Sequence, residues 1–395
     1  MNGPTLEVAD IIRQHGKDFI ESNRSRLTWQ QLKVLRAIEH CRTAALGGHL
    51  DRCSRCGHRA ISYNSCRNRH CPKCLTNARD RWLADRQKEL LNVGYFHVVF
   101  TLPHELSWLA LHNQKVVYQL LFQASAETLL EIAADPKHLG AQIGFLSVLH
   151  TWGQTLQHHP HLHCVIPAGG LSADGLRWVH PRYAFFLPVK LLSRVFRGKF
   201  VAALKRAFQK GKLVFPGSLH ALMSKPAFAA FLRTLFRKDW VVYAKPPFGG
   251  PEHVLHYLAR YTHRVAISNH RLLGLADGQV TFRWKDYADG SKKKKMTISA
   301  HEFLRRFLLH VLPKGFVRIR FFGFLANRRR STMLSQCRRL LAVQAESRTQ
   351  ALPLQPAVST WLCPLCGGPM IMVERLTAQQ VADRTPGLRS FDDSS

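Results

Sequence analysis

HHPHLHCVIPAGG, residues 158–170, alternates imidazole and apolar side chains from His161 to Val165. On a β-strand successive side chains point to opposite faces, so His161 and His163 share one face while Leu162 and Cys164 point into a core. Two neutral imidazoles on a rigid strand can bind a divalent ion and leave positions open for phosphate oxygens. Because 22 histidines in 395 residues give roughly one H-x-H by chance, the motif needs a chemical partner elsewhere.

The sequence on both sides of this stretch alternates between apolar runs of strand length and amphipathic helices. Ser299 stands three residues before Glu302, a capping box that opens a further helix. We therefore expect an α+β domain over residues 81–345. The predicted strands lie at 95–102, 161–167, 240–244, 264–268 and 279–284, and the predicted helices at 114–134, 192–209 and 252–262.

The flanking parts differ in composition from this domain. Residues 1–45 predict a helical segment of two helices, with Thr28 as the cap of the second. Residues 46–80 hold most of the cysteines and predict a small zinc-binding domain. Residues 346–395 are enriched in Pro and Ser and predict a loosely packed tail that carries one C-x2-C pair.

The cysteine-rich stretch contains two C-x2-C pairs, Cys53 with Cys56 and Cys71 with Cys74, separated by fourteen residues. Each pair can form a tight knuckle, and together the four thiolates close the coordination sphere of one structural zinc ion. Cys66 and His70 remain as alternative ligands or, with His49 or His58, as ligands of a second ion, so one or two zinc ions fit the sequence.

The distant pair Cys363 and Cys366 is half of a zinc site. Its other ligands come from elsewhere, such as another chain, or the pair is a metal-free turn. The sequence leaves both interpretations open.

The charge is strongly basic. The chain has 57 Lys and Arg against 25 Asp and Glu, a net charge of +32, which favours a polyanionic partner such as nucleic acid. Its 23 Phe, 8 Trp and 8 Tyr exclude a disordered polyelectrolyte. It has no apolar run of the ~18 residues that a membrane span needs and no signal peptide, so we expect a cytoplasmic protein without a membrane partner.

A chemical partner for the histidines is found in PEHVLHYLARYTHRVAISN, residues 251–269. On a helix Tyr257 and Tyr261 lie one turn apart on one face, with Arg260 and Arg264 nearby to contact phosphates. The same spacing also occurs in ordinary packing residues.

Four ordered blocks, SCRNRHCPKC, TWGQTLQHHPHLHCVIPAGG, YLARYTHRVAISN and EFLRRFLLHVLPKGFVRIRFFGFLANRRR, resemble the two-tyrosine HUH transposases of rolling-circle insertion sequences, the insertion sequence 91 type. The resemblance covers most of the chain. It implies a nuclease domain whose histidines lie on the central strand of an antiparallel sheet flanked by helices, preceded by a small zinc-binding domain.

The resemblance also implies a reaction. Tyr257 or Tyr261 attacks single-stranded DNA and leaves a 5′-phosphotyrosine, with Mg²⁺ or Mn²⁺ at His161 and His163 and a structural Zn²⁺ at the cysteines. A third ligand would come from Gln154, His253 or His256. No G-x-x-x-x-G-K-[ST] loop is present, so we expect no ATP-driven step.

DNA contacts are expected from basic residues, which bind the phosphate backbone with little sequence selectivity. A replication initiator or relaxase with the same chemistry, or a non-catalytic zinc-dependent DNA-binding protein, are the alternative functions. The expected location is the bacterial cytoplasm, at the nucleoid when DNA is bound. The contacting residues are Arg260, Arg264, Lys292, Lys293, Lys294, Lys295, Arg328, Arg329 and Arg330.

Overall fold

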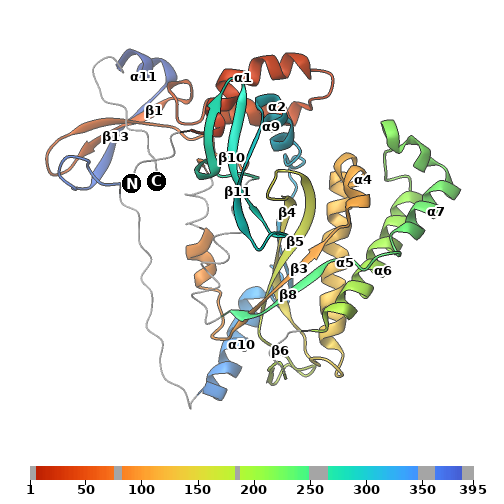
Figure 1. Cartoon of the computed structure of the whole chain (residues 1–395). Helices are drawn as coiled ribbons and strands as arrows, with labels where there is room; N and C mark the ends of the chain where they lie inside the picture. The colour runs from red at the N-terminus through yellow and green to blue at the C-terminus, as the bar shows by residue number, and fades with distance from the viewer. Residues whose placement is uncertain (1–5, 75–81, 183–186, 249–265, 346–360, 385–395) are drawn as a thin grey trace.

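The computed structural model describes residues 6–74, 82–182, 187–248, 266–345 and 361–384 (Figure 1). Tyr257, Tyr261, Arg260 and Arg264, together with the helix expected at 252–262, lie outside the described residues.

A five-stranded antiparallel sheet forms the centre of the molecule, with strand order β12-β4-β5-β3-β8. β5 is the middle strand, so the predicted α+β fold with its histidine motif on the central strand of an antiparallel sheet is confirmed. Of the strand predicted at 264–268, the described residues 266–268 are not in a strand. The strands are β3 (Tyr95–Thr101), β4 (Gly144–Trp152), β5 (His158–Pro167), β8 (Val242–Phe248) and β12 (Ile319–Gly323).

Helices cover one face of this sheet (Figure 1). Leu162 and Cys164 of β5 are fully buried in the core that α5 and α6 form with the sheet, as the alternation predicts. Phe100 of β3 meets Phe196 of α6 edge-on, with ring centroids 4.9 Å apart. The helices are α4 (Ser107–His112), α5 (Gln114–Ala134), α6 (Val189–Gln209) and α7 (Lys225–Thr234), with 3-10 turns η2 (His104–Leu106) and η3 (Gly217–Met223).

A second core joins the N-terminal helices to a three-stranded sheet of order β11-β10-β9. The apolar stripe of α1 packs against α9 and Phe282, so the boundary expected at residue 45 does not separate two cores. Thr28 caps α2 in a capping box with Gln31, as predicted. The elements are α1 (Val8–Ser22), α2 (Trp29–Glu39), η4 (Asn269–Arg271), β9 (Leu272–Ala276), β10 (Gln279–Asp286), β11 (Lys292–Ser299) and α9 (Ala300–Leu308).

A third sheet, of order β13-β1-β2, joins the C-terminal segment 361–384 to the cysteine-rich N-terminal region. Leu376 of β13 and Val381 of α11 are buried against Leu50 and Ile61. The prediction of a loosely packed tail is therefore wrong for 361–384, because the partner of β13 is β1, more than 300 residues earlier in the sequence. The elements are η1 (Ala44–Leu46), β1 (Gly48–Cys53), β2 (Arg59–Tyr63), β13 (Met370–Leu376) and α11 (Ala378–Arg384).

A hairpin and a helix pack together beside the central sheet. The hairpin of β6 (Gly170–Leu171) and β7 (Trp178–Val179) packs through Trp178 against α10 (Arg330–Ala345). None of the helices in the described ranges has both the length and the apolar character that a bilayer crossing requires.

The end of β12 depends on a glycine. Gly323 has a φ of +60°, and a Cβ built there would lie 1.8 Å from the carbonyl oxygen of Ile143. Its partner in the register is Gly144, so the two backbones approach closely where β12 joins the central sheet.

We expect Gly323→Ala to lower the free energy of unfolding by more than the ~1–2 kcal/mol that a left-handed conformation alone costs a non-glycine residue. Urea unfolding followed by circular dichroism measures the change. Gly274→Ala is the matched control, because Gly274 has open space around its Cα and no positive φ. Equal stability of the two variants would contradict the close approach at Gly323.

Candidate active site and metal centres

Three histidines converge on the face of the central sheet opposite the helices. His161 and His163 of β5 are joined by His150 of β4, and the nitrogens that they can offer lie within 4.8 Å of one another. The ring centroids are 5.4 Å apart for His150 and His161, 4.5 Å for His150 and His163, and 4.9 Å for His161 and His163. The shared face of β5 predicted from alternation is thus observed.

His150 reaches this site through strand register. The antiparallel pairing of β4 with β5 places His150 directly opposite His161. Opposite residues in such a pair have Cβ atoms about 4.5–5.5 Å apart, within reach of one ion. Sequence reasoning missed His150, because a single histidine in GFLSVLHTW carries no signal until the register is known.

The sequence suggests Gln154, His253 and His256 as candidates for a third ligand. Gln154 directs its side-chain amide to the hydroxyl of Tyr287, at 3.3 Å. His253 and His256 lie outside the described residues.

Hydrogen bonds orient the two histidines of β5. Nδ1 of His161 donates to the carbonyl oxygen of His159 at 2.7 Å, which leaves Nε2 of His161 with a free lone pair. Nδ1 of His163 lies 2.8 Å from Nε2 of His97 on β3, and the two rings are stacked. When Nδ1 of His163 carries the proton of that bond, Nε2 of His163 is also available to an ion.

Burial keeps the imidazoles of His161 and His97 neutral. It lowers the pKa of His161 to about 4, with a smaller contribution from His159, and the pKa of His97 to about 3. Near neutral pH both rings are therefore uncharged, the form that a metal ligand requires.

The donor set fits a divalent ion. Three neutral imidazoles contribute no negative charge, and no Asp or Glu joins them among the described residues. An ion held by them would keep its full double charge and have open positions for phosphate oxygens. Of the two expected ions, Mn²⁺ fits nitrogen ligands better than Mg²⁺, which binds almost entirely through oxygen.

The cysteines form two clusters rather than one. Cys41, Cys66, Cys71 and Cys74 make the first, and Cys53, Cys56, Cys363 and Cys366 make the second. The predicted single site of Cys53, Cys56, Cys71 and Cys74 is therefore wrong in its grouping. The β1–β2 hairpin explains this: its turn carries Cys53 and Cys56, while the chain returns along β2 before it reaches Cys66.

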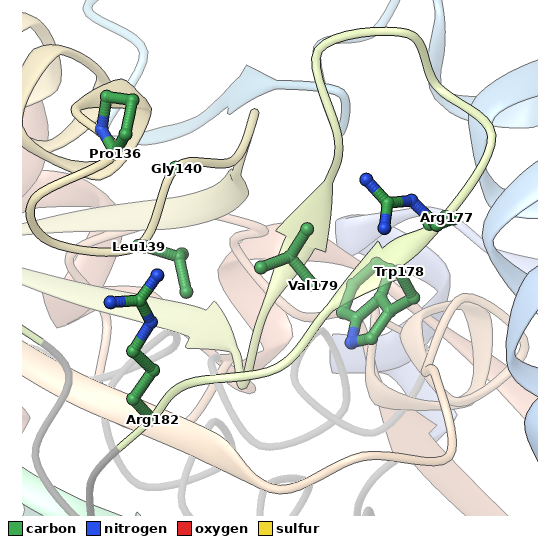
Figure 2. A pocket seen from close by; sticks show the side chains of 7 residues that line it. All are labelled: Pro136, Leu139, Gly140, Arg177, Trp178, Val179 and Arg182. Carbon is green, nitrogen blue, oxygen red and sulfur yellow. The ribbon is translucent and has the colours of Figure 1, made fainter.

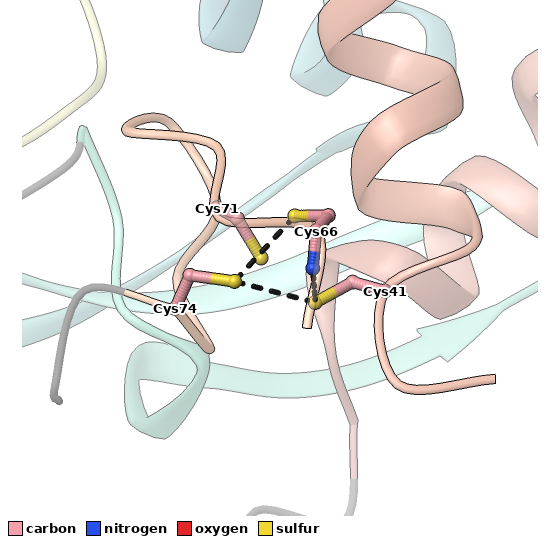
Figure 3. A group of neighbouring side chains, drawn as sticks. All are labelled: Cys41, Cys66, Cys71 and Cys74. Atoms are coloured by element: carbon pink, nitrogen blue, oxygen red, sulfur yellow. Dashed lines mark hydrogen bonds between the residues drawn. The ribbon is translucent and has the colours of Figure 1, made fainter. Parts of the chain in front are cut away.

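The first cluster, shown in Figure 3, has the dimensions of a closed thiolate site. Sγ of Cys74 lies 3.5 Å from Sγ of Cys41 and 3.5 Å from Sγ of Cys66. Zn–S bonds of about 2.3 Å place tetrahedral sulfurs about 3.8 Å apart. Cys41 follows α2, so its participation could not be inferred from C-x2-C spacing.

Residues of the same loop fasten this cluster to the rest of the protein. Arg69 donates to the carbonyl oxygens of Pro313 and Phe316, at 2.9 and 2.5 Å. His70, expected as a spare ligand, instead accepts from the backbone N–H of Leu312 at 3.1 Å. Burial, with the charge of Arg69, lowers the pKa of His70 to about 3.

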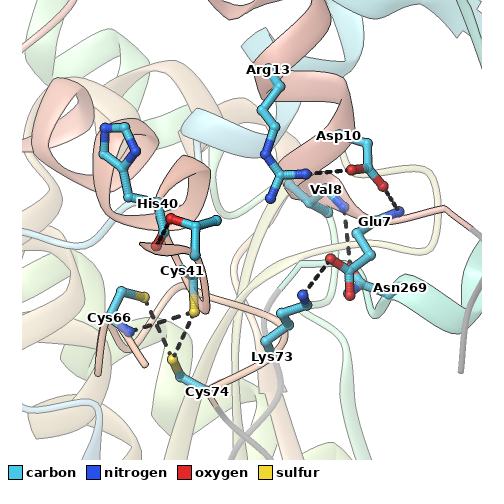
Figure 4. Close-up of polar contacts among 11 residues, drawn as sticks. Glu7, Val8, Asp10, Arg13, His40, Cys41, Cys66, Lys73, Cys74 and Asn269 are labelled. Atoms are coloured by element: carbon cyan, nitrogen blue, oxygen red, sulfur yellow. Dashed lines mark hydrogen bonds and ion pairs between the residues drawn. The ribbon is translucent and has the colours of Figure 1, made fainter. Parts of the chain in front are cut away.

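The loop also contacts the first helix, as Figure 4 shows. Lys73 pairs with Glu7 at 2.8 Å, and Glu7 accepts from the side chain of Asn269. The side chain of Asn269 accepts in turn from the backbone N–H of Val8 at the start of α1. The first cysteine cluster is therefore part of the packing between the zinc-binding segment and the second core.

The basic run at 292–295 is divided by strand alternation. Lys294 lies 2.8 Å from Asp286 and 3.0 Å from Asp289, and Lys292 pairs with Asp289. Lys293 and Lys295 are exposed on the other face, opposite Lys285 and Arg283 of β10. No acidic partner of these four cations is found among the described residues. They form the basic hairpin face: Arg283, Lys285, Lys293 and Lys295.

The predicted arginines near 329 differ from one another. Arg328 and Arg329 are exposed, whereas Arg330 is half-buried, pairs with Glu89 at 3.3 Å and lies over the ring of Phe321. Arg330 therefore stabilises the fold.

A surface pocket lies elsewhere, between the turn after α5 and the β6–β7 hairpin (Figure 2). Its side chains include Arg177 and Arg182 at the surface and the buried Trp178. It contains none of the histidines or cysteines of the three clusters.

Comparison with known proteins defines the class. A family model described as "Transposase zinc-binding domain" matches residues 11–102, and one described as "Putative transposase" matches residues 144–332. The second match contains all three clustered histidines. This is a transposase with an N-terminal zinc-binding domain.

Two relatives extend the match over most of the chain. "Putative transposase y4qJ" of Sinorhizobium fredii is 58% identical over 352 residues, 89% of this chain and 88% of that protein. "Transposase for insertion sequence element IS801" of Pseudomonas savastanoi pv. phaseolicola is 27% identical over 354 residues, 86% of this chain and 83% of that protein. The chain belongs to the insertion sequence 91 family of transposases.

We expect His150→Ala to weaken Mn²⁺ binding at least about tenfold, as His161→Ala does, because each removes one of three ligands. Titration calorimetry or electron paramagnetic resonance of the zinc-loaded protein measures the affinity. His112→Ala, at an exposed position of α4, is the control. If the His150 variant bound Mn²⁺ with full affinity and Gln154→Ala lost affinity, His150 would not be the third ligand.

Proposed function

We propose that this transposase nicks and rejoins single-stranded DNA through a 5′-phosphotyrosine intermediate, and moves an insertion sequence by a rolling-circle-like mechanism. The observation that carries the proposal is the convergence of His150, His161 and His163 on one face of the central sheet. Family membership supports the DNA substrate.

The nucleophiles are assigned from the sequence motif, because Tyr257 and Tyr261 lie outside the described residues. The phenol oxygen attacks the scissile phosphorus, and the bond from phosphorus to the 3′ oxygen breaks. The products are a tyrosyl phosphodiester and a strand with a free 3′-hydroxyl, which takes up the proton. A second 3′-hydroxyl reverses the step without ATP, because the adduct conserves the energy of the phosphodiester.

The role of the three histidines would be to hold a divalent ion beside the scissile phosphate. A divalent ion at this site would polarise a phosphate oxygen and stabilise the negative charge that develops during attack. His159 and His97 orient the imidazoles of His161 and His163. A free tyrosine has a pKa near 10 and is a weak nucleophile at neutral pH, so electrostatic assistance at the phosphate is required.

The basic hairpin face supports a path for the DNA backbone. Lys293 and Lys295 are exposed, and together with Arg283 and Lys285 they place four cations on one surface. Exposed Arg328 and Arg329 are further candidates. Such contacts give affinity with little base selectivity.

A covalent protein–DNA adduct is expected when the full-length protein is mixed with a single-stranded element end and Mn²⁺. The adduct should disappear in Tyr257→Phe/Tyr261→Phe, and decrease strongly in His161→Ala and His150→Ala. Denaturing gel electrophoresis with labelled DNA detects it. Tyr243→Phe, at an exposed tyrosine of β8, is the control. An adduct that persists in the double tyrosine variant would show that Tyr257 and Tyr261 are not the nucleophiles.

Lys293→Ala/Lys295→Ala should reduce the slope of log affinity against log salt concentration by about 1.4, since each phosphate contact to a single strand contributes about 0.7. Fluorescence anisotropy over a salt series measures the slope. Lys115→Ala/Lys137→Ala removes the same charge from exposed positions outside the hairpin. Equal changes in both double variants would mean that net charge, rather than the basic hairpin face, determines binding.

A further inference from the structure

The second cysteine cluster joins two segments that are distant in the sequence. Sγ of Cys53 lies 3.5 Å from Sγ of Cys366, which is 313 residues away, and Sγ of Cys56 lies 3.7 Å from Sγ of Cys363. All four sulfurs lie within 4.8 Å of one another. Cys363 and Cys366 fall outside both matched family regions.

The two C-x2-C turns of this cluster have the same backbone structure. The N–H of Cys53 donates to the carbonyl of His58 at 2.8 Å, and the N–H of Cys363 donates to the carbonyl of Gly368 at 2.7 Å. In both turns, the backbone N–H of the glycine four residues after the first cysteine donates to the backbone carbonyl oxygen of that cysteine. These glycines, Gly57 and Gly367, have φ values of +73° and +67°.

The backbone of this repeated turn can stabilise a cysteine thiolate. In the first turn the backbone N–H of Arg55 points to Sγ of Cys53 at 3.4 Å, a contact that stabilises a thiolate. Two such turns facing each other supply four sulfurs to one centre. They therefore form a pair of knuckles, the arrangement expected of a closed tetrahedral site.

The sulfur separations distinguish a metal site from disulfides. Disulfide-bonded sulfurs are about 2.05 Å apart. Tetrahedral sulfurs around zinc are about 3.8 Å apart, close to the 3.5 and 3.7 Å observed here. The missing half-site of Cys363 and Cys366 is thus supplied by the same chain.

Few apolar contacts hold this end of the small sheet. Its buried cluster, which includes Leu50 and Leu376, lies toward the other end of β1. Near the knuckles Leu365 is 69% exposed and Ile371 is 57% exposed. A small sheet with so little buried surface commonly depends on a structural metal ion for its stability.

We propose that Cys53, Cys56, Cys363 and Cys366 bind a second structural zinc ion, which fastens residues 361–384 to the N-terminal zinc-binding domain. Four thiolates leave no open position for substrate, so the ion is structural. The ion fixes the turn at the end of β1 next to the start of β13, where Ser54 donates its backbone N–H to Pro369. The proposal does not depend on the nicking reaction.

Metal analysis of the purified full-length protein tests this directly. We expect two zinc ions per chain in the wild type and one in Cys363→Ser/Cys366→Ser. Cys337→Ser, a buried cysteine outside both clusters, should retain two. One zinc ion in the wild type, iron in place of zinc, or two zinc ions in the double variant would overturn the proposal.

Hydrogen exchange provides a second readout that does not require the variant to bind DNA. In the double variant, the amides of Met370–Leu376 should lose protection while those of β5 keep theirs. Thiol counting after denaturation and zinc removal should give ten reactive cysteines without a reductant. A count of six would show two disulfides and refute the zinc site.

Discussion

The antiparallel pairing of β4 with β5 is the interaction on which the site depends. It buries Leu162 and Cys164 against the helices, and the same alternation directs His161 and His163 to the opposite face. A slip of one residue in β5 would exchange these faces, placing imidazoles in the apolar core and leucine at the site. Packing of the helical face thus fixes the register that brings His150 to the other two histidines.

Each cysteine cluster brings together separate segments of the chain. The first is attached through Arg69 and His70 to the segment after α9, and through Lys73 to Glu7 before α1. The proposed second site would join residues 361–384 to the N-terminal zinc-binding domain across the β1–β13 pair. At the second site, metal ligation would be effective because it closes a long loop around little buried surface.

The net charge of +32 overstates the surface available to DNA. Several cations have structural roles: Arg306 pairs with Glu302, Arg330 with Glu89, and Lys294 with Asp286. Among the exposed cations, Arg283, Lys285, Lys293 and Lys295 gather on the basic hairpin face. Strand alternation, rather than the number of lysines in the run, decides which of them can meet a phosphate.

The sequence by itself determined the features that depend on the spacing of residues close together in the chain. It predicted the α+β class, the 114–134 helix, the cap at Thr28 and the common face of His161 and His163, because these depend on neighbours a few residues away. Family resemblance added the antiparallel sheet. Only the tertiary structure decided that His150 completes the histidine cluster and that the cysteines divide into two groups. Those assignments depend on strand register and on contacts between distant segments, which no local pattern specifies.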